Sequence, residues 1–334
     1  MSYRVYLTRK LSGLVVTVLL IATLNFFLFQ VLPGDPTRVL IPRGGGSATN
    51  VTELEGLRQQ LTREWGLDRP VYERFGIYFV NLILGNWGTS ITLRPGSSVW
   101  AVIIPALSTT LVFTGTATLI SIWIGMRLGQ FSGWRRGKLP DTGISLVSLV
   151  LYSMPTFWMA FALIFVLAVY VPILPVGGEA TYPAYYGYDF FGKVADRILH
   201  LVLPVLTFVL NNYAIFTLIM RNSLVEELSE DYMTTARAKG LSPLQQLLRH
   251  AIPNARLPVA TVVALYVGWI LSGAIVIEVV FDLNGLGALT WDAVTNRDFP
   301  LLSAIFLLGT FGVVVANTIL DIAYSYIDPR VTEA

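Results

Sequence analysis

The sequence contains no cysteine and little charge. The absence of cysteine excludes a disulfide framework, zinc or iron–sulfur sites with cysteine ligands, and a cysteine nucleophile. Charged residues make up 13% of the 334 residues, whereas an average soluble domain has about 25%. Hydrophobic residues reach 54%, and this much apolar surface needs lipid around it. The composition therefore predicts an integral membrane protein, and a formal net charge of +2 gives no sign of a nucleic-acid partner.

Motifs for catalysis are also absent from the sequence. It has no phosphate-binding Gly-x4-Gly-Lys-Ser/Thr pattern and no Gly-x-Ser-x-Gly nucleophile elbow. Its two histidines, His200 and His250, are not at the spacing of a metal-ligand pair. We interpret both as packing or helix-end residues rather than as a proton relay. The chain alone is expected to be neither an enzyme nor an ATPase, and no metal site or cofactor is predicted in it.

Six apolar segments are long enough to cross a hydrocarbon core about 30 Å thick as helices, and none has a charge in its middle third. They run approximately over residues 11–32, 106–126, 144–171, 198–220, 257–280 and 301–324. The first is too long for a signal peptide and lacks a small-residue cleavage site, so we expect it to be retained. The predicted fold is an all-α membrane protein with six transmembrane helices.

Basic residues in the connections predict the orientation of these helices. The N-terminal tail and the second and fourth connections are basic, whereas the third and fifth contain mostly carboxylates. Since basic loops stay in the cytoplasm, both termini are expected there, in a cell membrane. The basic residues are Arg4, Arg9, Lys10, Arg127, Arg135, Arg136, Lys138, Arg221, Arg237, Lys239, Arg249 and Arg256.

The first connection, residues 33–100, is then external. Within it, Thr52 and Glu55 form a helix-capping pattern ahead of leucines at helical spacing, which predicts a small external helical subdomain. Its leucines are expected to pack onto the membrane helices, with contact to an external delivery protein as the alternative. The predicted domains are a tail with the first helix (1–32), the external subdomain (33–100) and a five-helix transmembrane core (101–334).

Polar and small residues inside the apolar segments predict how the helices pack. Asparagines are expected to bond neighbouring helices, with the lining of a polar pathway as the alternative, and paired glycines are expected to let helices approach closely. The asparagines are Asn25, Asn211, Asn212 and Asn317, and the glycine pairs are Gly125 with Gly129, Gly268 with Gly273, and Gly309 with Gly312.

Two features concern polar groups at membrane depth. Met154-Pro155 interrupts the third segment and frees backbone carbonyls that need donors from protein or water. Glu278 and Asp282 lie at the predicted outer end of the fifth segment, where we expect both carboxylates to stay hydrated.

The fourth connection, about residues 221–256, carries the most distinctive pattern. An acidic start precedes an alanine-rich run from Thr234 with high helix propensity, and Gly240 suits a left-handed stop. The pattern predicts a short exposed helix that docks a soluble partner. The alternative is an amphipathic segment that rests on lipid headgroups.

A second helix is expected directly after this stop. Ser242 can cap it, and Leu244, Leu247 and Leu248 would form one apolar face that lies against the membrane helices.

The pattern Ala236-x3-Gly240-x9-His250-Ala251-Ile252-Pro253 resembles the EAA loop of permease subunits of ATP-binding-cassette (ABC) importers. The common form of that loop is Glu-Ala-Ala-x3-Gly-x9-Ile-x-Leu-Pro. Thr234 and Thr235 stand at its Glu-Ala positions and His250 replaces Ile, which is similar to the dipeptide and oligopeptide branch, where Asp-Tyr precedes Thr-Ala-Arg-Ala-Lys-Gly-Leu. By this resemblance, the ATPase subunits dock on Asp231, Tyr232, Thr235, Ala236, Arg237, Ala238, Lys239, Gly240, Leu241, His250 and Pro253.

Other segments are similar to the B-type peptide permease in the same order along the chain. They are residues 32–36, 65–70, 85–90, 153–158, 281–287 and 328–330. The resemblance implies a type I ABC importer permease fold in which two homologous permeases form the pathway. It also implies two nucleotide-binding subunits that hydrolyse ATP with Mg, and an extracytoplasmic solute-binding protein that delivers substrate.

The resemblance does not fix the substrate or the residues that contact it. Peptides are the commonest substrates of this branch, and oligosaccharides or nickel complexes are the alternatives. The aromatic segment 182–188 suits a membrane interface, which we prefer, or sugar stacking. A stand-alone secondary carrier is disfavoured because no charge lies at mid-helix, and an intramembrane enzyme because the chain lacks a nucleophile or metal set.

Overall fold

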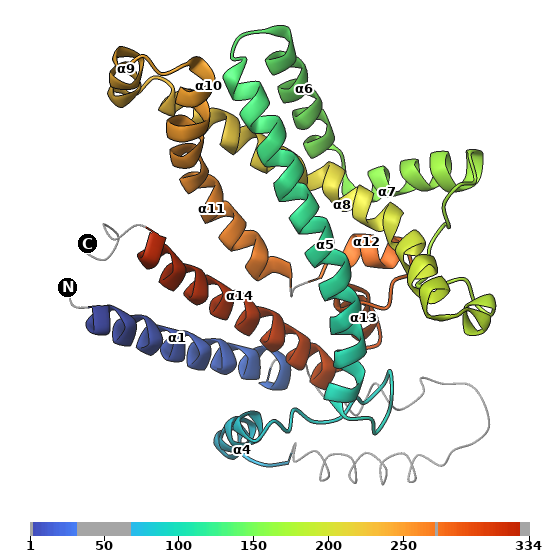
Figure 1. The fold of residues 1–334 in the computed structure, drawn as a ribbon. Coiled ribbons are helices and arrows are strands. Elements are labelled where there is room, and N and C mark those ends of the chain that lie inside the picture. The colour runs from blue at the N-terminus through green and yellow to red at the C-terminus, as the bar shows by residue number, and fades with distance from the viewer. Residues whose placement is uncertain (1–2, 32–67, 271–272, 328–334) are drawn as a thin grey trace. The chain divides into compact units, whose positions relative to one another are not determined.

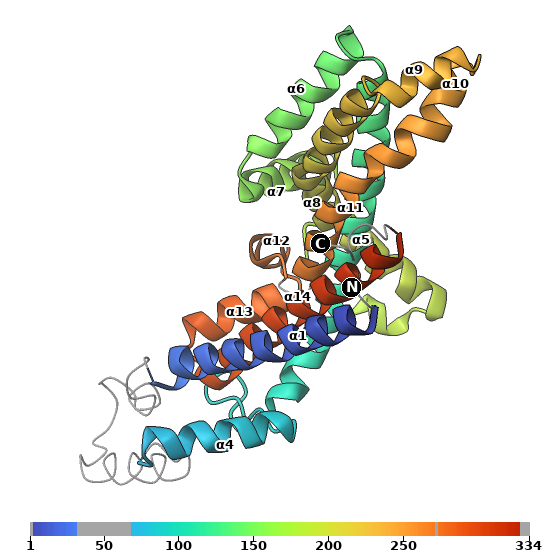
Figure 2. The ribbon, with the colours of Figure 1, turned by 90° about the vertical axis from the view of Figure 1, so that its left-hand side faces the viewer.

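The structure is a computed structural model that describes residues 3–31, 68–270 and 273–327. Regular secondary structure in these residues is helical, apart from an isolated β-bridge between Thr89 and Ser98. Figures 1 and 2 show the helices from two directions. In chain order they are α1 (Tyr3–Phe26), η1 (Phe27–Val31), α4 (Val71–Ile83), α5 (Val99–Trp134), α6 (Leu139–Ser153), α7 (Thr156–Ile164), η2 (Phe165–Tyr170), η3 (Ala184–Gly187), α8 (Phe190–Glu227), α9 (Asp231–Ala238), α10 (Pro243–Gln246), η4 (Leu247–Ala251), α11 (Ile252–Trp269), α12 (Ile275–Val280), α13 (Leu286–Thr295) and α14 (Phe299–Ile327).

Five helical stretches in the described residues are long and apolar enough to cross a membrane. They are Thr8–Phe29, Val99–Trp134, Phe190–Glu227, Pro243–Gly268 and Phe299–Ile319, and the bent pair of Leu139–Ser153 with Thr156–Tyr170 brings the number to six if it counts as one span. The prediction of an all-α membrane protein is thus confirmed, with five or six candidate spans.

Two of the predicted segments are not continuous helices. The third bends by 100° between α6 and α7, where Met154-Pro155 interrupts it as predicted. The prediction of one helix over residues 257–280 is wrong, because α11 ends at Trp269 and α12 is a separate short helix. Gly273 stands between them with a φ of +72°, a left-handed conformation that cannot continue an α-helix. Gly273 therefore does not form a helix-packing face with Gly268.

The chain folds into two compact units, Met1–Ala106 with Leu289–Ala334, and Leu107–Ala288. We call them unit 1 and unit 2. The capping pattern at Thr52 and Glu55, on which the predicted external subdomain rests, lies outside the described residues.

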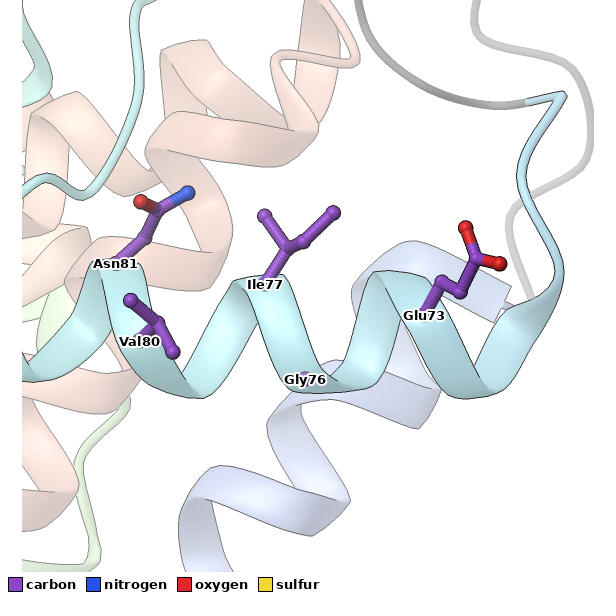
Figure 3. Close-up of a pocket in the computed structure, with 5 residues that line it drawn as sticks. All are labelled: Glu73, Gly76, Ile77, Val80 and Asn81. Atoms are coloured by element: carbon purple, nitrogen blue, oxygen red, sulfur yellow. The ribbon is translucent and has the colours of Figure 1, made fainter.

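Helix α4 is the described helical part of the first connection and belongs to unit 1. It has no buried residue, and Figure 3 shows one of its sides, which lines a shallow surface depression. The lining residues are Glu73, Gly76, Ile77, Val80 and Asn81. On another side its aromatic rings meet α1, where Phe75 packs edge-to-face on Phe26 with ring centroids 5.2 Å apart.

Buried polar contacts hold unit 1 together. Asn25 of α1 donates to the Ser303 carbonyl of α14 at 3.0 Å and accepts from the Ser303 hydroxyl at 2.5 Å. Asn25 therefore bonds a neighbouring helix, as predicted. Asp298, which is fully buried before α14, accepts the Ser90 hydroxyl at 2.5 Å and the backbone N–H groups of residues 91–93 at 3.1–3.2 Å.

Unit 2 is built around α8, which packs against α5, α6, α7 and α11 (Figure 1). The approach of α5 to α8 depends on glycines. A Cβ on Gly125 would lie 2.5 Å from the Phe216 Cβ, and one on Gly129 would lie 2.5 Å from the Thr217 carbonyl oxygen. Gly133 repeats this contact one turn further on. The predicted Gly-x3-Gly packing face is confirmed here, and it extends over three glycines.

Backbone groups freed at the bend in α6–α7 are satisfied by α8. The Asn211 amide donates to the Met154 carbonyl at 3.1 Å, and its oxygen accepts from the Thr156 hydroxyl at 3.1 Å. Asn212 instead donates to the Phe208 carbonyl of its own helix at 2.9 Å, so the prediction that it bonds a neighbouring helix is not met by this contact. The two asparagines differ because only the first points at the broken helix, whose carbonyl needs a donor.

His200 and Glu278 are both buried in unit 2. His200 near the start of α8 lies within 2.9 Å of the Gly177 carbonyl oxygen and 3.1 Å of the Thr181 hydroxyl, so it packs the α7–α8 connection, as predicted. Glu278 is fully buried, and the prediction that it stays hydrated is wrong, whereas Asp282 is exposed. Backbone donors around Glu278 replace water.

Substitution of Gly129 by Val should destabilise unit 2 by about 1–3 kcal/mol, because the new side chain overlaps the backbone of α8. Gly115→Val is the matched control, since it lies in the same helix and a Cβ there meets nothing within 4 Å. Thermal unfolding of the purified proteins in detergent, followed by tryptophan fluorescence, measures the difference. Equal midpoints for the two variants would contradict the close α5–α8 contact.

Candidate functional site

Helix α9 extends from the main body of unit 2 as a short separate helix after α8 (Figure 2). Glu230 is its N-cap residue and has extended backbone angles, and Asp231 lies in its first turn. Arg237 lies in its last turn. Acidic residues at the start and a basic residue at the end both complement the helix dipole, which stabilises a helix only eight residues long.

One face of α9 is buried and the other is exposed. Met233 and Ala236 are 1% and 5% exposed, and their spacing of three residues places them on one side of the helix. Met233 packs in a cluster with Phe216, Met220, Leu224, Leu247, Ala251, Ile252, Ala255 and Val259. Buried side chains three residues apart place α9 against the ends of two candidate spans.

Tyr232 ties the start of α9 to both neighbouring helices. Its hydroxyl donates to the Glu227 carboxylate at the end of α8 and accepts from the Asn254 amide of α11 at 3.2 Å. Burial raises the pKa of Tyr232 above its ordinary value of about 10, and the Glu227 carboxylate adds to the rise. The phenol therefore keeps its proton at neutral pH, and the tether is lost only when the pH rises through this higher pKa.

The end of α9 is a Schellman stop. The Gly240 N–H donates to the Arg237 carbonyl at 2.9 Å, and the Leu241 N–H donates to the Ala236 carbonyl at 3.4 Å. Gly240 has a φ of +75°, so the predicted left-handed conformation is confirmed. A Cβ at Gly240 would meet nothing within 4 Å, so the need for glycine comes from the backbone conformation alone.

The segment after the stop turns back toward the membrane helices. Ser242 and Gln245 form a capping box around α10, and the Gln246 amide donates to the Leu241 carbonyl at 2.7 Å. These bonds fix the angle between α9 and the next helix.

The predicted apolar face of this second helix is only partly correct. Leu247 is buried, but Leu244 and Leu248 are 51% and 55% exposed. The chain passes into a π-helical turn at η4, which changes the rotation per residue, so one leucine of the three faces the core. The exposed apolar surface of Leu244 and Leu248 is available to lipid or to a partner.

The predicted docking residues gather on and beside α9. Most of them are exposed: Asp231, Thr235, Arg237, Ala238, Lys239, Gly240 and Pro253. Tyr232, Leu241 and His250 are half-buried, and Ala236 is buried. Ala236 is therefore covered, whereas the exposed residues form a surface that a partner can contact.

A partly buried ion pair in unit 2 was not found from the sequence. Asp141, which is 3% exposed at the start of α6, accepts from the Arg221 Nε at 2.6 Å and Nη2 at 2.8 Å. It also accepts from the Ser132 hydroxyl at 2.5 Å and the Gly137 N–H at 2.9 Å. The pair joins the turn between α5 and α6 to the end of α8. Its only sequence signal is an acidic residue inside a basic connection.

Comparisons with known proteins place the chain in a family of membrane transport components. Residues 121–333 match the family described as binding-protein-dependent transport system inner membrane component, and residues 3–114 match the N-terminal family of the same membrane components. The chain belongs to this family of ABC importer permeases and is a multi-pass membrane protein.

Named relatives cover nearly the whole chain. A probable peptide ABC transporter permease, y4tP of Sinorhizobium fredii, is 32% identical over 98% of this chain and 99% of its own length. The di/tripeptide transport system permease DppB of Pseudomonas aeruginosa is 34% identical over 98% of both chains. The glutathione transport system permease GsiC of Escherichia coli is also 34% identical over 98% of both.

Replacement of Tyr232 by Phe should loosen α9. A hydrogen bond to a charged group contributes about 1.5–3 kcal/mol, so amide hydrogens of α9 should exchange about tenfold faster or more. Tyr186→Phe, at an exposed ring, is the control. At a pH above about 10 the wild-type exchange, corrected for its intrinsic rate, should rise toward that of the variant. Identical exchange in both proteins at neutral pH would show that the phenol does not hold the helix.

Proposed function

We propose that this chain is the permease subunit of an ABC importer for di- and oligopeptides, and that α9 is the coupling helix on which an ATPase subunit docks. The observation that carries the proposal is the two-sided α9, with Met233 and Ala236 buried and Thr235, Arg237 and Lys239 exposed. ATP hydrolysis, with Mg, belongs to two separate nucleotide-binding subunits.

The packing of α9 suits the transmission of a movement. Met233 lies in one cluster with side chains of α8 and α11, and Tyr232 bonds both of these helices. Because packed protein interiors have low compressibility, a displacement of α9 by a docked partner moves the ends of α8 and α11 with it. The opening and closing of a substrate pathway between helices requires this kind of link.

The peptide substrate is inferred from relatives, several of which are named as peptide, dipeptide or oligopeptide permeases. The aromatic segment that also suited sugar stacking has Tyr185 packed against Tyr182, with the Lys193 ammonium and the Arg197 guanidinium over its ring. These contacts occupy the face of that ring. The proposal of a peptide substrate rests on these relatives.

We propose that the end of unit 2 that bears α9 faces the cytoplasm, as do both termini. The Arg221–Asp141 pair joins the α5–α6 turn to the end of α8, so the exposed Arg135, Arg136 and Lys138 lie at the same end as α9. A second homologous permease supplies the other half of the pathway, and a solute-binding protein delivers substrate from the opposite side.

Purification of the chain from its native membrane should bring with it two nucleotide-binding subunits and a second six-helix permease. The complex should hydrolyse ATP, and the chain alone should not, because it has no nucleotide-binding motif. Mass spectrometry of the intact complex and an ATPase assay of both preparations check this. Robust hydrolysis, or substrate uptake, by the chain alone would overturn the assignment.

Gly240→Val should uncouple transport. A β-branched residue in the left-handed conformation costs about 1–2 kcal/mol, so the Schellman stop is strained and residues 236–239 are misdirected. We expect uptake to fall several-fold while membrane insertion persists. Gly240→Asn is the matched control, since Asn tolerates this conformation better.

The measurement is uptake in reconstituted vesicles beside quantified assembly with the ATPase subunits. Normal uptake and normal substrate-stimulated hydrolysis in Gly240→Val, at wild-type abundance, would remove α9 as the coupling element.

A further inference from the structure

Glu278 in α12 is a fully buried carboxylate whose hydrogen-bond partners are all donors. Its Oε1 accepts from the Thr110 hydroxyl of α5 at 2.9 Å and from the Ala274 N–H at 3.3 Å. Its Oε2 accepts from the Ala288 N–H at 3.0 Å. Thr110 in turn accepts from the Leu286 N–H at 2.7 Å. One carboxylate thus holds α5, α12 and the start of α13 together.

Glycines shape the surroundings of this carboxylate. A Cβ on Gly285 would overlap the Glu278 carboxylate and lie 2.6 Å from the Thr110 hydroxyl oxygen. A Cβ on Gly287 would lie 2.9 Å from the Glu278 Oε2 and 2.7 Å from the Ile275 nitrogen. The segment 281–288 can close around Glu278 only because these two positions have no side chain.

A second carboxylate, from another connection, also bonds α5 and the segment 281–288. Glu179, in the segment between α7 and α8, accepts from the Thr109 hydroxyl at 3.1 Å and from the Asn284 N–H at 3.3 Å. The Gly178 N–H donates to the Phe281 carbonyl at 2.7 Å. Adjacent threonines of α5 therefore bond two carboxylates, and both carboxylates bond the segment 281–288.

The chemistry of this contact suits repeated opening. Burial of a carboxylate without a cation is costly unless its oxygens are fully hydrogen-bonded, and here hydroxyl and N–H donors supply those bonds. If the segment 281–288 separates from α5, water can replace the same donors. An apolar contact would lose its stabilisation in water, whereas a carboxylate exchanges one set of donors for another. The closed and open arrangements can therefore lie close in free energy.

The position of Glu278 along the molecule also matters. Thr110 and Gly133 are separated by about 35 Å along α5, at about 1.5 Å per residue. Gly133 lies beside Leu224, near the end of α8 that leads to α9. Glu278 therefore lies at the end of unit 2 opposite α9, which the proposed orientation places outside.

We propose that Glu278 is a positioning residue for transport: it latches segment 281–288 to α5 and closes unit 2 at the end opposite α9. The latch releases when that end opens to take up substrate. This inference rests on the proposed function, because it assigns the latch to a transport cycle.

The test uses Leu286, whose side chain is fully buried beside the latch. Because the chain has no cysteine, Leu286→Cys gives a single thiol whose reaction with a polar maleimide reports opening. The intact complex is reconstituted in nanodiscs, where both faces are accessible, so the result does not depend on orientation. The latch is weakened by Thr110→Val, which is isosteric, and by Glu278→Gln, whose amide presents N–H groups to backbone donors.

The matched control is Thr207→Val. Thr207 is also fully buried in unit 2, but its hydroxyl bonds only the Leu203 carbonyl of its own helix at 2.8 Å in the contacts described. We expect Thr110→Val and Glu278→Gln to raise the labelling rate about tenfold, and Thr207→Val to leave it unchanged. Thr110→Ser, which keeps the hydroxyl, should restore slow labelling. If Glu278→Gln does not fold, Thr110→Val decides.

A second measurement separates a latch from a permanent structural contact. With Thr110 and Glu278 intact, labelling of Leu286→Cys should rise several-fold during turnover with ATP, solute-binding protein and a dipeptide. No rise during active turnover, or unchanged labelling in Thr110→Val, overturns the latch. If no ATPase subunit assembles with the chain, the proposed function fails, while the comparison of Thr110→Val with Thr207→Val still tests the contact itself.

Discussion

The close approach of α5 to α8 is the contact on which unit 2 depends. At Gly125 and Gly129 there is no room for even one carbon between the two helices, so their backbones touch. In a membrane, where lipid is as apolar as the side chains, such van der Waals contact replaces the hydrophobic effect as the source of helix association. Helix α8 also packs against α6, α7 and α11, and its end carries α9. The position of the proposed docking surface therefore follows from this helix pair.

A second constraint is that buried backbone N–H groups outside regular helices need hydrogen-bond acceptors. In this protein buried carboxylates supply those acceptors at three places. Asp298 takes three N–H groups of the segment before α5, Asp141 takes the N–H of Gly137, and Glu278 takes those of Ala274 and Ala288. Asp141 and Glu278 lie in α6 and α12, and Asp298 directly precedes α14; each accepts N–H groups from outside regular helix or from a helix end. An unsatisfied backbone group in such a place costs several kcal/mol, which a single acidic side chain avoids.

Asn211 applies the same principle with an amide. It supplies a donor to the carbonyl at Met154 and an acceptor for the Thr156 hydroxyl, so the bend of 100° between α6 and α7 leaves its polar groups paired. The bend lies between α6 and α7, and the side chain that pairs its polar groups comes from α8. In lipid without α8, the Met154 carbonyl would lack this donor.

Local signals in the sequence predicted the features that depend on local chemistry. The apolar lengths of the spans, the interruption at Met154-Pro155 and the left-handed stop at Gly240 each follow from a few neighbouring residues. The break after α11 did not, because residues 257–280 are mostly apolar, whereas the separate α12 depends on contacts with α7, α8 and residues 285–288. The burial of Glu278 likewise depends on Thr110, far away in the chain. Long-range partners of this kind leave no periodic signal.

The charge of Arg221 differs in its surroundings between membrane insertion and the folded protein. In the folded protein its charge is neutralised by Asp141, so it adds little to the charge of the surface. During insertion into the membrane the pair has not formed, and the basic character of a connection acts on the unfolded chain. In the folded protein the same guanidinium is partly buried and bonds the Asp141 carboxylate, so its positive charge no longer stands free in the connection.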